Sequence, residues 1–129
     1  MGFGMLRVMR LTQERSDDLN WIRRYDAAQL VVGDQLLHGP CIIAPRTLIA
    51  SWSAPAPAQL RLNDLRQALD LQPRILLLAL PGAATDLNLE VRRALRERNV
   101  GLETMERGAA CRTYNVLATE GRDVVAVFW

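Results

Sequence analysis

Six consecutive residues, Ile75 to Leu80, are apolar, and Pro81 ends the run. A strand that is apolar at every position has no polar face to present to water, so both of its faces must be covered. Such strands occupy the centre of parallel sheets, whose strands are joined by helices that lie over the sheet. The run is far shorter than the roughly 20 apolar residues of a membrane-spanning helix. It therefore predicts a buried central strand in an α/β fold.

The second half of the chain shows the apolar spacing of helices that alternate with strands. It follows a Pro- and Ala-rich linker at residues 53–58, which we expect to run extended over the surface. We expect helices at 62–69, 89–98 and 109–119, and strands at 74–80, 101–106 and 122–129. Asn63 and Asn88 are placed to cap the first two helices, and Asn99 to end the second. This order contains at least one βαβ unit with parallel strands.

The first half has the short segments typical of antiparallel strands, which we expect at 21–25, 29–32, 35–38, 41–44 and 47–52. Gly33 and Asp34 lie between two of these segments and predict a tight hairpin turn. The fold class is therefore α/β, with an N-terminal antiparallel β layer followed by a mixed sheet that contains a βαβ unit and three helices. We expect residues 1–129 to form one domain, in which residues 1–19 are candidates for poor order.

The basic residues restrict the chemistry, because all 16 of them are arginine. A chain without lysine cannot use a lysine amine to form a Schiff base or to bind phosphate in a P-loop. The arginines are also spread evenly: residues 1–60 hold six against five acidic residues, and residues 61–129 hold ten against nine. A nucleic-acid-binding protein concentrates its basic residues in a patch. We therefore expect no nucleic acid among the partners.

The chain offers few ligands for a metal, since it has one histidine, His38, and two cysteines, Cys41 and Cys111. A tetrahedral zinc site made only of cysteine and histidine would lack one ligand. No glycine-rich phosphate-binding motif is present either, so we expect no cofactor. Two cysteines do not make a disulfide framework, so we expect free thiols in a cytoplasmic protein.

Two features of the sequence concern membranes and targeting. No apolar run approaches the length of a membrane span, so we expect a protein that is not integral to a membrane. The first twelve residues are rich in apolar side chains and carry Arg7 and Arg10 without an acidic residue. They lack the apolar core of about 7–15 residues that a secretory signal peptide has, so we do not expect one.

The best candidate site lies where the predicted parallel strands end. Both strands of a βαβ unit end at the same edge of the sheet, so the loop at 81–86 and the turn at 107–110 should be neighbours. The third predicted helix begins there, with Cys111 and Arg112 in its first turn. A helix N-terminus and an arginine both suit an anion, and both would lower the pKa of a thiol. The simpler interpretation of Cys111 is that it fills a tight helix–sheet contact, and we expect that role.

Three segments carry a resemblance to a known family: "GDQLLHGPCIIAP" (33–45), "ILLLALPGA" (75–83) and "GAACRTYNVLATEGR" (108–122). In this order they resemble a family of small domains of unknown function from proteobacteria and archaea, which includes mitochondrial complex I assembly factor three. The resemblance runs from about Asn20 to Val127, and "ACRTYNVL" is its most specific part. This chain has Leu80-Pro81-Gly82 where the family usually has Gly-Thr-Gly, so ligand binding by that loop is not implied.

The resemblance implies a non-catalytic interaction or assembly-factor-like module with a protein partner, which could be an assembly intermediate of a membrane complex. We expect a protein segment or a small anion to bind in the crevice at Gly108–Asn115. The residues that we expect to contact it are Gly82, Ala83, Gly108, Cys111, Arg112 and Asn115. The alternative is a weak enzyme that uses Cys111 as its nucleophile on a small anionic substrate. That alternative lacks a general base, because His38 belongs to a separate hairpin.

Overall fold

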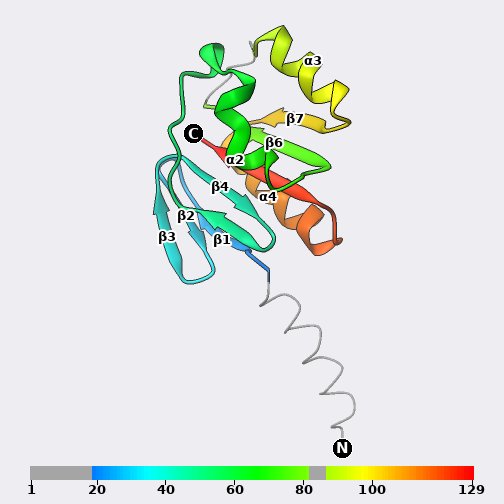
Figure 1. The fold of residues 1–129 in the computed structure, drawn as a ribbon. Helices are drawn as coiled ribbons and strands as arrows, with labels where there is room; N and C mark the ends of the chain where they lie inside the picture. The colour runs from blue at the N-terminus through cyan, green and yellow to red at the C-terminus, as the bar shows by residue number, and fades with distance from the viewer. Residues whose placement is uncertain (1–18, 82–86) are drawn as a thin grey trace, which may run out of the picture.

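The chain forms two β-sheets, and helices lie over the larger one (Figure 1). The computed structural model describes residues 19–81 and 87–129. The smaller sheet is antiparallel, in the order β1 (Ile22–Tyr25), β2 (Gln29–Val32) and β3 (Gln35–His38). The larger sheet has the order β5 (Thr47–Ile49), β4 (Cys41–Ala44), β8 (Val124–Phe128), β6 (Ile75–Ala79) and β7 (Gly101–Met105). The predicted fold class, an antiparallel β layer followed by a mixed sheet, is confirmed.

Strand direction divides the larger sheet into two parts. β4 is antiparallel to both of its neighbours, β5 and β8, whereas β8, β6 and β7 run parallel to one another. β6 is thus the central parallel strand that the apolar run predicts. α3 (Leu89–Glu97) joins β6 to β7 in the predicted βαβ unit, and α4 (Arg107–Thr119) joins β7 to β8. The three parallel strands therefore all end at one edge of the sheet.

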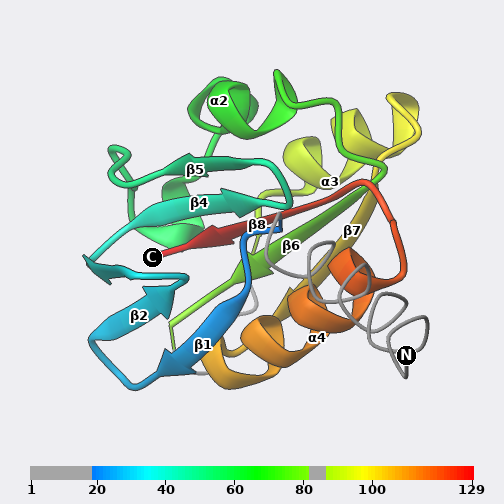
Figure 2. The same ribbon diagram turned by 90° about the horizontal axis from the view of Figure 1, so that it is seen from below.

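Helices cover both faces of the larger sheet (Figure 2). α2 (Arg66–Leu69) and α3 lie on one face, and α4 lies on the other, beside the smaller sheet. Alternate residues of β6 serve the two faces: Leu76 and Leu78 pack with the cluster under α2 and α3, whereas Leu77 and Ala79 pack with the cluster under α4. A strand buried on both faces needs apolar residues at every position, which is what the sequence supplies.

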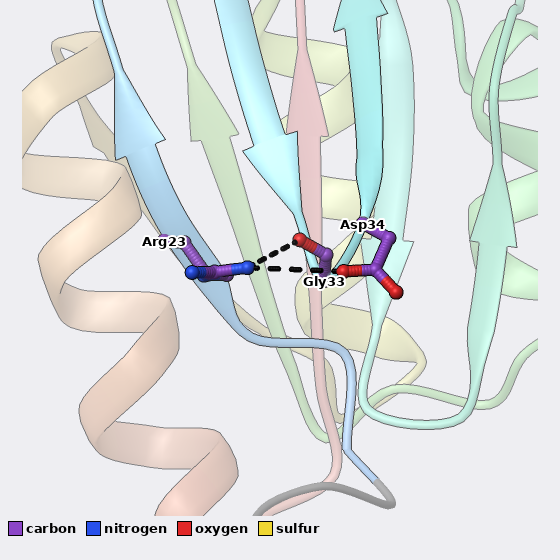
Figure 3. Close-up of polar contacts among 3 residues, drawn as sticks. All are labelled: Arg23, Gly33 and Asp34. Carbon is purple, nitrogen blue, oxygen red and sulfur yellow. Dashed lines mark hydrogen bonds and ion pairs between the residues drawn. The ribbon is translucent and has the colours of Figure 1, made fainter.

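The hairpin of β2 and β3 turns at Gly33 and Asp34, as predicted. Gly33 has a φ of +57°, a conformation that glycine adopts without steric cost. The side chain of Arg23 reaches this turn from β1 (Figure 3): its Nη1 donates to the Gly33 carbonyl at 3.3 Å and lies 3.8 Å from Asp34 Oδ1. Both side chains are exposed, so this ion pair adds little to stability.

Most predicted boundaries agree with the structure within two residues, including the cap at Asn88, whose Oδ1 accepts from Glu90 N at 2.8 Å. The helix predicted at 62–69 is different. It begins as a 3₁₀ turn, Leu62–Leu65, and only Arg66–Leu69 is α-helical. Asn63 lies inside that turn, so the predicted cap is wrong. The N-cap is Arg61, and Asp64, the third residue of the turn, closes it, because its Oδ2 accepts from Arg61 N at 2.9 Å.

The linker and the strand before it also differ from the prediction. Residues Pro57–Gln59 form a 3₁₀ turn, so the linker is not extended throughout. The strand predicted at 47–52 ends at Ile49, because Trp52 leaves the sheet edge and packs inward. Trp52 Nε1 donates to the Phe128 carbonyl at 2.9 Å, and its ring meets that of Trp129 edge to face at 5.2 Å. Tertiary packing overrides strand propensity at this point.

Candidate functional site

A pocket of ≈ 650 Å³ opens at the edge of the sheet where the parallel strands end. Four parts of the chain meet there: the end of β6, the start of α4, the end of β8 and the turn after β1. The described residues that line it are Tyr25, Asp26, Ala27, Ala79, Leu80, Pro81, Glu106, Arg107, Gly108, Arg112 and Trp129. The predicted neighbours are the loop at 81–86 and the turn at 107–110, and residues 82–86 of that loop lie outside the described residues. Its first residue, Pro81, lines the same pocket as Arg107 and Gly108, and the strand ends before the two segments are joined where Leu80 N donates to the Met105 carbonyl at 2.9 Å.

Arg112 and Tyr25 form the polar rim of this pocket. Arg112 Nη1 donates to the hydroxyl oxygen of Tyr25 at 2.7 Å, and both side chains are exposed. Gly108 lies under the ring: a Cβ at this position would come within 3.2 Å of Tyr25 Cε1 and 3.3 Å of Arg112 Nη1. Glycine at this position therefore lets the tyrosine and the arginine lie close to the first turn of α4.

Arg107 fixes the inner side of the pocket to the end of β8. Its Nη2 donates to the Trp129 carbonyl at 2.9 Å, and its guanidinium lies 5.8 Å from the centre of the Phe128 ring. Trp129 Nε1 in turn donates to the Pro55 carbonyl at 2.6 Å. Arg107 is thus held by the main-chain oxygen of Trp129 and an aromatic face, and no side-chain carboxylate of the described residues lies within ion-pair distance of it.

Asp26 adds a fixed negative charge. Its Oδ1 accepts from the backbone N–H groups of Ala28 and Gln29, both at 2.8 Å, in the turn between β1 and β2. These two hydrogen bonds lower the pKa of the Asp26 carboxyl, and the positive charge of Arg107 lowers it further. The pocket therefore combines two arginines with Asp26 and Glu106, which faces solvent.

Cys111 faces away from the pocket and into the core. Its side chain packs in the cluster under α4, which also contains Cys41, and only 1% of Cys111 is exposed. Burial raises the pKa of its thiol to about 12, and the nearby arginines oppose that shift without reversing it. Arg112 lowers this pKa, as expected, but the loss of hydration on burial outweighs its effect. Cys111 therefore has the packing role that we expected. Both cysteines are free thiols, as expected.

Asn115 binds the backbone of β1. Its Oδ1 accepts from Ile22 N at 3.0 Å, and its Nδ2 donates to the Ile22 carbonyl at 2.9 Å. The amide thus takes the place of a neighbouring strand along the outer edge of β1, which would otherwise be unpaired. One residue earlier in α4, the hydroxyl of Tyr114 donates to the Asn20 carbonyl at 2.7 Å. α4 therefore holds the N-terminal β layer by polar side chains as well as by apolar packing.

The predicted site residues thus fall into three groups. Gly108 and Arg112 line the pocket. Cys111 packs in the core, and Asn115 has both amide atoms on β1. Gly82 and Ala83 lie outside the described residues.

The expected contact residues omit most of the lining, including Tyr25, Arg107 and Trp129. Arg107 could have been found, because it follows the second parallel strand directly. Trp129 could have been found as well, since β8 is parallel to β6 and ends at the same edge. Tyr25 could not, because its position depends on how the small sheet packs against α4.

Within residues 19–81 and 87–129, no group of three or more His, Cys, Asp and Glu side chains is arranged to hold a metal ion. Over the same ranges, no helix has the length and apolar character needed to cross a membrane.

Comparison with known proteins gives consistent matches. The family model described as "Protein of unknown function (DUF498/DUF598)" matches residues 22–129. NADH dehydrogenase [ubiquinone] 1 alpha subcomplex assembly factor 3 of Bos taurus is 29% identical over 114 residues, which cover 87% of this chain and 61% of that protein. The Homo sapiens protein of the same name is 25% identical with the same coverage. The chain therefore spans less than two thirds of the length of these relatives.

Solved bacterial structures have the same fold. A crystal structure from Bordetella parapertussis is 34% identical, with a TM-score of 0.77, and covers 85% of this chain and 94% of that one. An NMR structure from Xanthomonas campestris is also 34% identical, with a TM-score of 0.74 and coverage of 83% and 81%. A Bordetella pertussis protein described as a Mth938-like domain is 28% identical, with a TM-score of 0.73 and coverage of 86% and 85%. Taken with the family match over residues 22–129, these likenesses show that the chain belongs to the family described as protein of unknown function DUF498/DUF598.

Proposed function

We propose that this domain is a non-catalytic interaction module that takes part in protein assembly and holds a segment of its partner in the pocket beside α4. The curated relatives are named as assembly factors, which supports a protein partner. By this analogy the partner is an assembly intermediate of a membrane complex, contacted from the cytoplasm. The residues proposed to contact it are Gly108 and Arg112, together with Tyr25, Arg107 and Trp129.

One observation carries this proposal. Arg107 and Arg112 line a pocket of ≈ 650 Å³, and neither is within ion-pair distance of a side-chain carboxylate among the described residues. Tyr25 and Trp129 lie in the same lining. Arginine, tyrosine and tryptophan are the residues that contribute most of the binding energy at protein interfaces. The lining therefore suits a protein segment.

Two other functions have less support from this pocket. The first is binding of a small anion, which the guanidinium of Arg112 at the start of α4 would suit. An enzyme that uses Cys111 is opposed by the burial of its thiol, whose pKa of about 12 keeps it protonated at neutral pH.

A capture experiment tests the proposal. The immobilised domain should retain a specific protein from a lysate of the source organism, and Arg112→Ala should lose it. Arg93→Ala is the matched control, because Arg93 is an exposed arginine of α3, on the opposite face of the sheet. Equal retention by the wild type and Arg112→Ala would exclude the pocket as the contact surface. A parallel NMR titration with inorganic phosphate tests the small anion. Chemical-shift changes at Gly108 and Arg112 that saturate below roughly 1 mM phosphate would favour it.

A further inference from the structure

Arg112 and Tyr25 keep hydrogen-bonding capacity that none of the residues at 19–81 and 87–129 uses. A guanidinium has five N–H donors, and among the described residues Arg112 has one hydrogen-bond partner, the Tyr25 hydroxyl. Because that hydroxyl accepts from Arg112, its own proton is available to donate. The two side chains therefore present hydrogen-bond donors side by side at the rim of the pocket. The two oxygens of a carboxylate can accept from both donors at once.

The charge of the lining indicates how much negative charge the occupant carries. Arg107 and Arg112 are balanced in number by Asp26 and Glu106. Asp26 is held by two backbone N–H groups and keeps its charge, because its pKa is lowered. A doubly charged phosphate would meet repulsion from both acids, whereas a single carboxylate at Arg112 meets less of it. The lining is thus better matched to one negative charge.

The size and the inner wall of the pocket indicate that this charge belongs to a longer segment. A lone carboxylate would fill only a small part of ≈ 650 Å³, which is within the range of sites that bind drug-sized ligands. The wall beyond the rim is apolar, with Leu80, Pro81 and Trp129. An apolar side chain next to the charged one would bury its surface against this wall.

We infer that the pocket recognises a protein segment in which an aspartate or glutamate stands next to an apolar residue. Arg112 binds the carboxylate, and Tyr25 both positions Arg112 and donates a second hydrogen bond. Leu80, Pro81 and Trp129 take the apolar neighbour. This inference rests on the proposed function and names the chemistry of its partner.

A displayed random peptide library, selected on the immobilised domain, provides the probe. The selected peptides should be enriched in acidic residues next to apolar ones. One of them is then synthesised with both ends blocked, so that its only carboxylate is on a side chain, and its dissociation constant is measured by calorimetry. Replacing the acidic residue of the peptide by its amide should weaken binding roughly tenfold to a hundredfold, as loss of a charged hydrogen bond does.

Variants of the domain separate the two roles at the rim. Arg112→Ala should weaken binding as much as the amide peptide does, and the two changes together should cost no more than either alone. Tyr25→Phe keeps the ring over Gly108 and should weaken binding several-fold, with little effect for the amide peptide. Arg93→Ala should bind as the wild type does. All three variants should unfold within a few degrees of the wild type.

Failure of this inference and failure of the proposed function look different. Selected peptides without acidic residues, or equal binding of the acid and amide peptides, would overturn the inference even if Arg112→Ala or Trp129→Ala still weakens binding. If no selected peptide binds, or if binding is unchanged by Arg112→Ala, Tyr25→Phe and Trp129→Ala, the pocket is not the contact surface and both fall.

Discussion

The two faces of the five-stranded sheet are held in different ways. The face under α2 and α3 is closed by a cluster that consists of apolar side chains, among them Leu76, Leu78 and Leu95. The face under α4 has an apolar cluster as well, but it must also hold a second β-sheet, and polar side chains of α4 hold that layer. The packing on the first face only stabilises the fold, whereas the contacts on the second face also bring distant segments together at the pocket.

This difference follows from what each face must cover. A helix that only covers a sheet face packs on it through apolar area, which has no directional preference. A sheet edge such as that of β1 has backbone groups that need partners in fixed positions. Asn115, Tyr114 and Arg112 supply direct contacts to the segment from Asn20 to Tyr25. We call this line of contacts between α4 and the segment from Asn20 to Tyr25 the seam. The pocket lies at its end, where directional contacts set the position of Tyr25.

The largest effects are expected in the strand that both faces share. Leu77→Ala and Leu78→Ala each remove a fully buried side chain, one from each face, and each should lower the free energy of unfolding by about 2–5 kcal/mol. Because β6 contributes to both clusters, each variant should still unfold in one cooperative transition. Urea unfolding followed by tryptophan fluorescence and circular dichroism measures both properties. Two separate transitions in either variant would mean that the faces are independent units.

The next largest effect concerns the seam itself. Asn115→Ala leaves the N–H and C=O of Ile22 without their partners, and should cost about 1–3 kcal/mol. The loss should be local, so amide hydrogen exchange of Ile22 should accelerate more than that of Leu78. Val116→Ala is the matched control on the same helix, because that side chain is exposed and should change stability little. Unchanged exchange at Ile22 would show that water replaces the asparagine at little cost.

The cysteines give the face under α4 a dependence on pH that the other face lacks. Burial raises the pKa of Cys41 to about 11 and that of Cys111 to about 12, whereas thiols of the unfolded chain ionise near roughly pH 8.5. Between these values the unfolded state loses protons that the folded state keeps, so stability should fall as the pH rises above roughly 8.5. Below that pH the thiols are protonated in both states, so their ionisation should not change the free energy of unfolding.

Urea midpoints measured from pH 7 to pH 10 test this dependence. The double variant Cys41→Ala/Cys111→Ala is the control, and its stability should fall less over the same range. A thiol reagent at pH 8 should modify neither cysteine until the protein is unfolded. Rapid modification of Cys111 in the folded protein would contradict its burial and revive the enzymatic alternative.

Much of the architecture could be predicted, because local pattern and burial agree over most of the chain. The apolar run at Ile75–Leu80 predicts the central strand, and Asn88 caps α3 as its position indicates. The errors lie where tertiary contacts decide. Trp52 ends β5 early because its indole bonds to the end of β8, and Asp64 closes a turn that the helical period alone assigns to an α-helix.

The pocket was only partly predictable for a related reason. The rule that parallel strands end at one edge brings together the segments around Pro81 and Gly108, and both line the pocket. The direction in which each side chain points is a matter of helix phase. Cys111 and Arg112 are adjacent in the first turns of α4, yet the thiol points into the core and the guanidinium points into the pocket. A small error in where the helix starts changes which of them is accessible.

The smallest effect on stability is expected for Arg112→Ala. The side chain is exposed, and its hydrogen bond to Tyr25 is also exposed, so the melting temperature should change by no more than a degree or two. Asn115→Ala provides the comparison, because both residues tie α4 to β1 but only Asn115 bonds to backbone groups of β1. A fall of many degrees in Arg112→Ala, measured by calorimetry, would make the Arg112–Tyr25 contact a structural tie of the seam. Arg112 and Tyr25 would then stabilise the fold, and the loss of binding in Arg112→Ala could no longer be assigned to a missing contact with the partner.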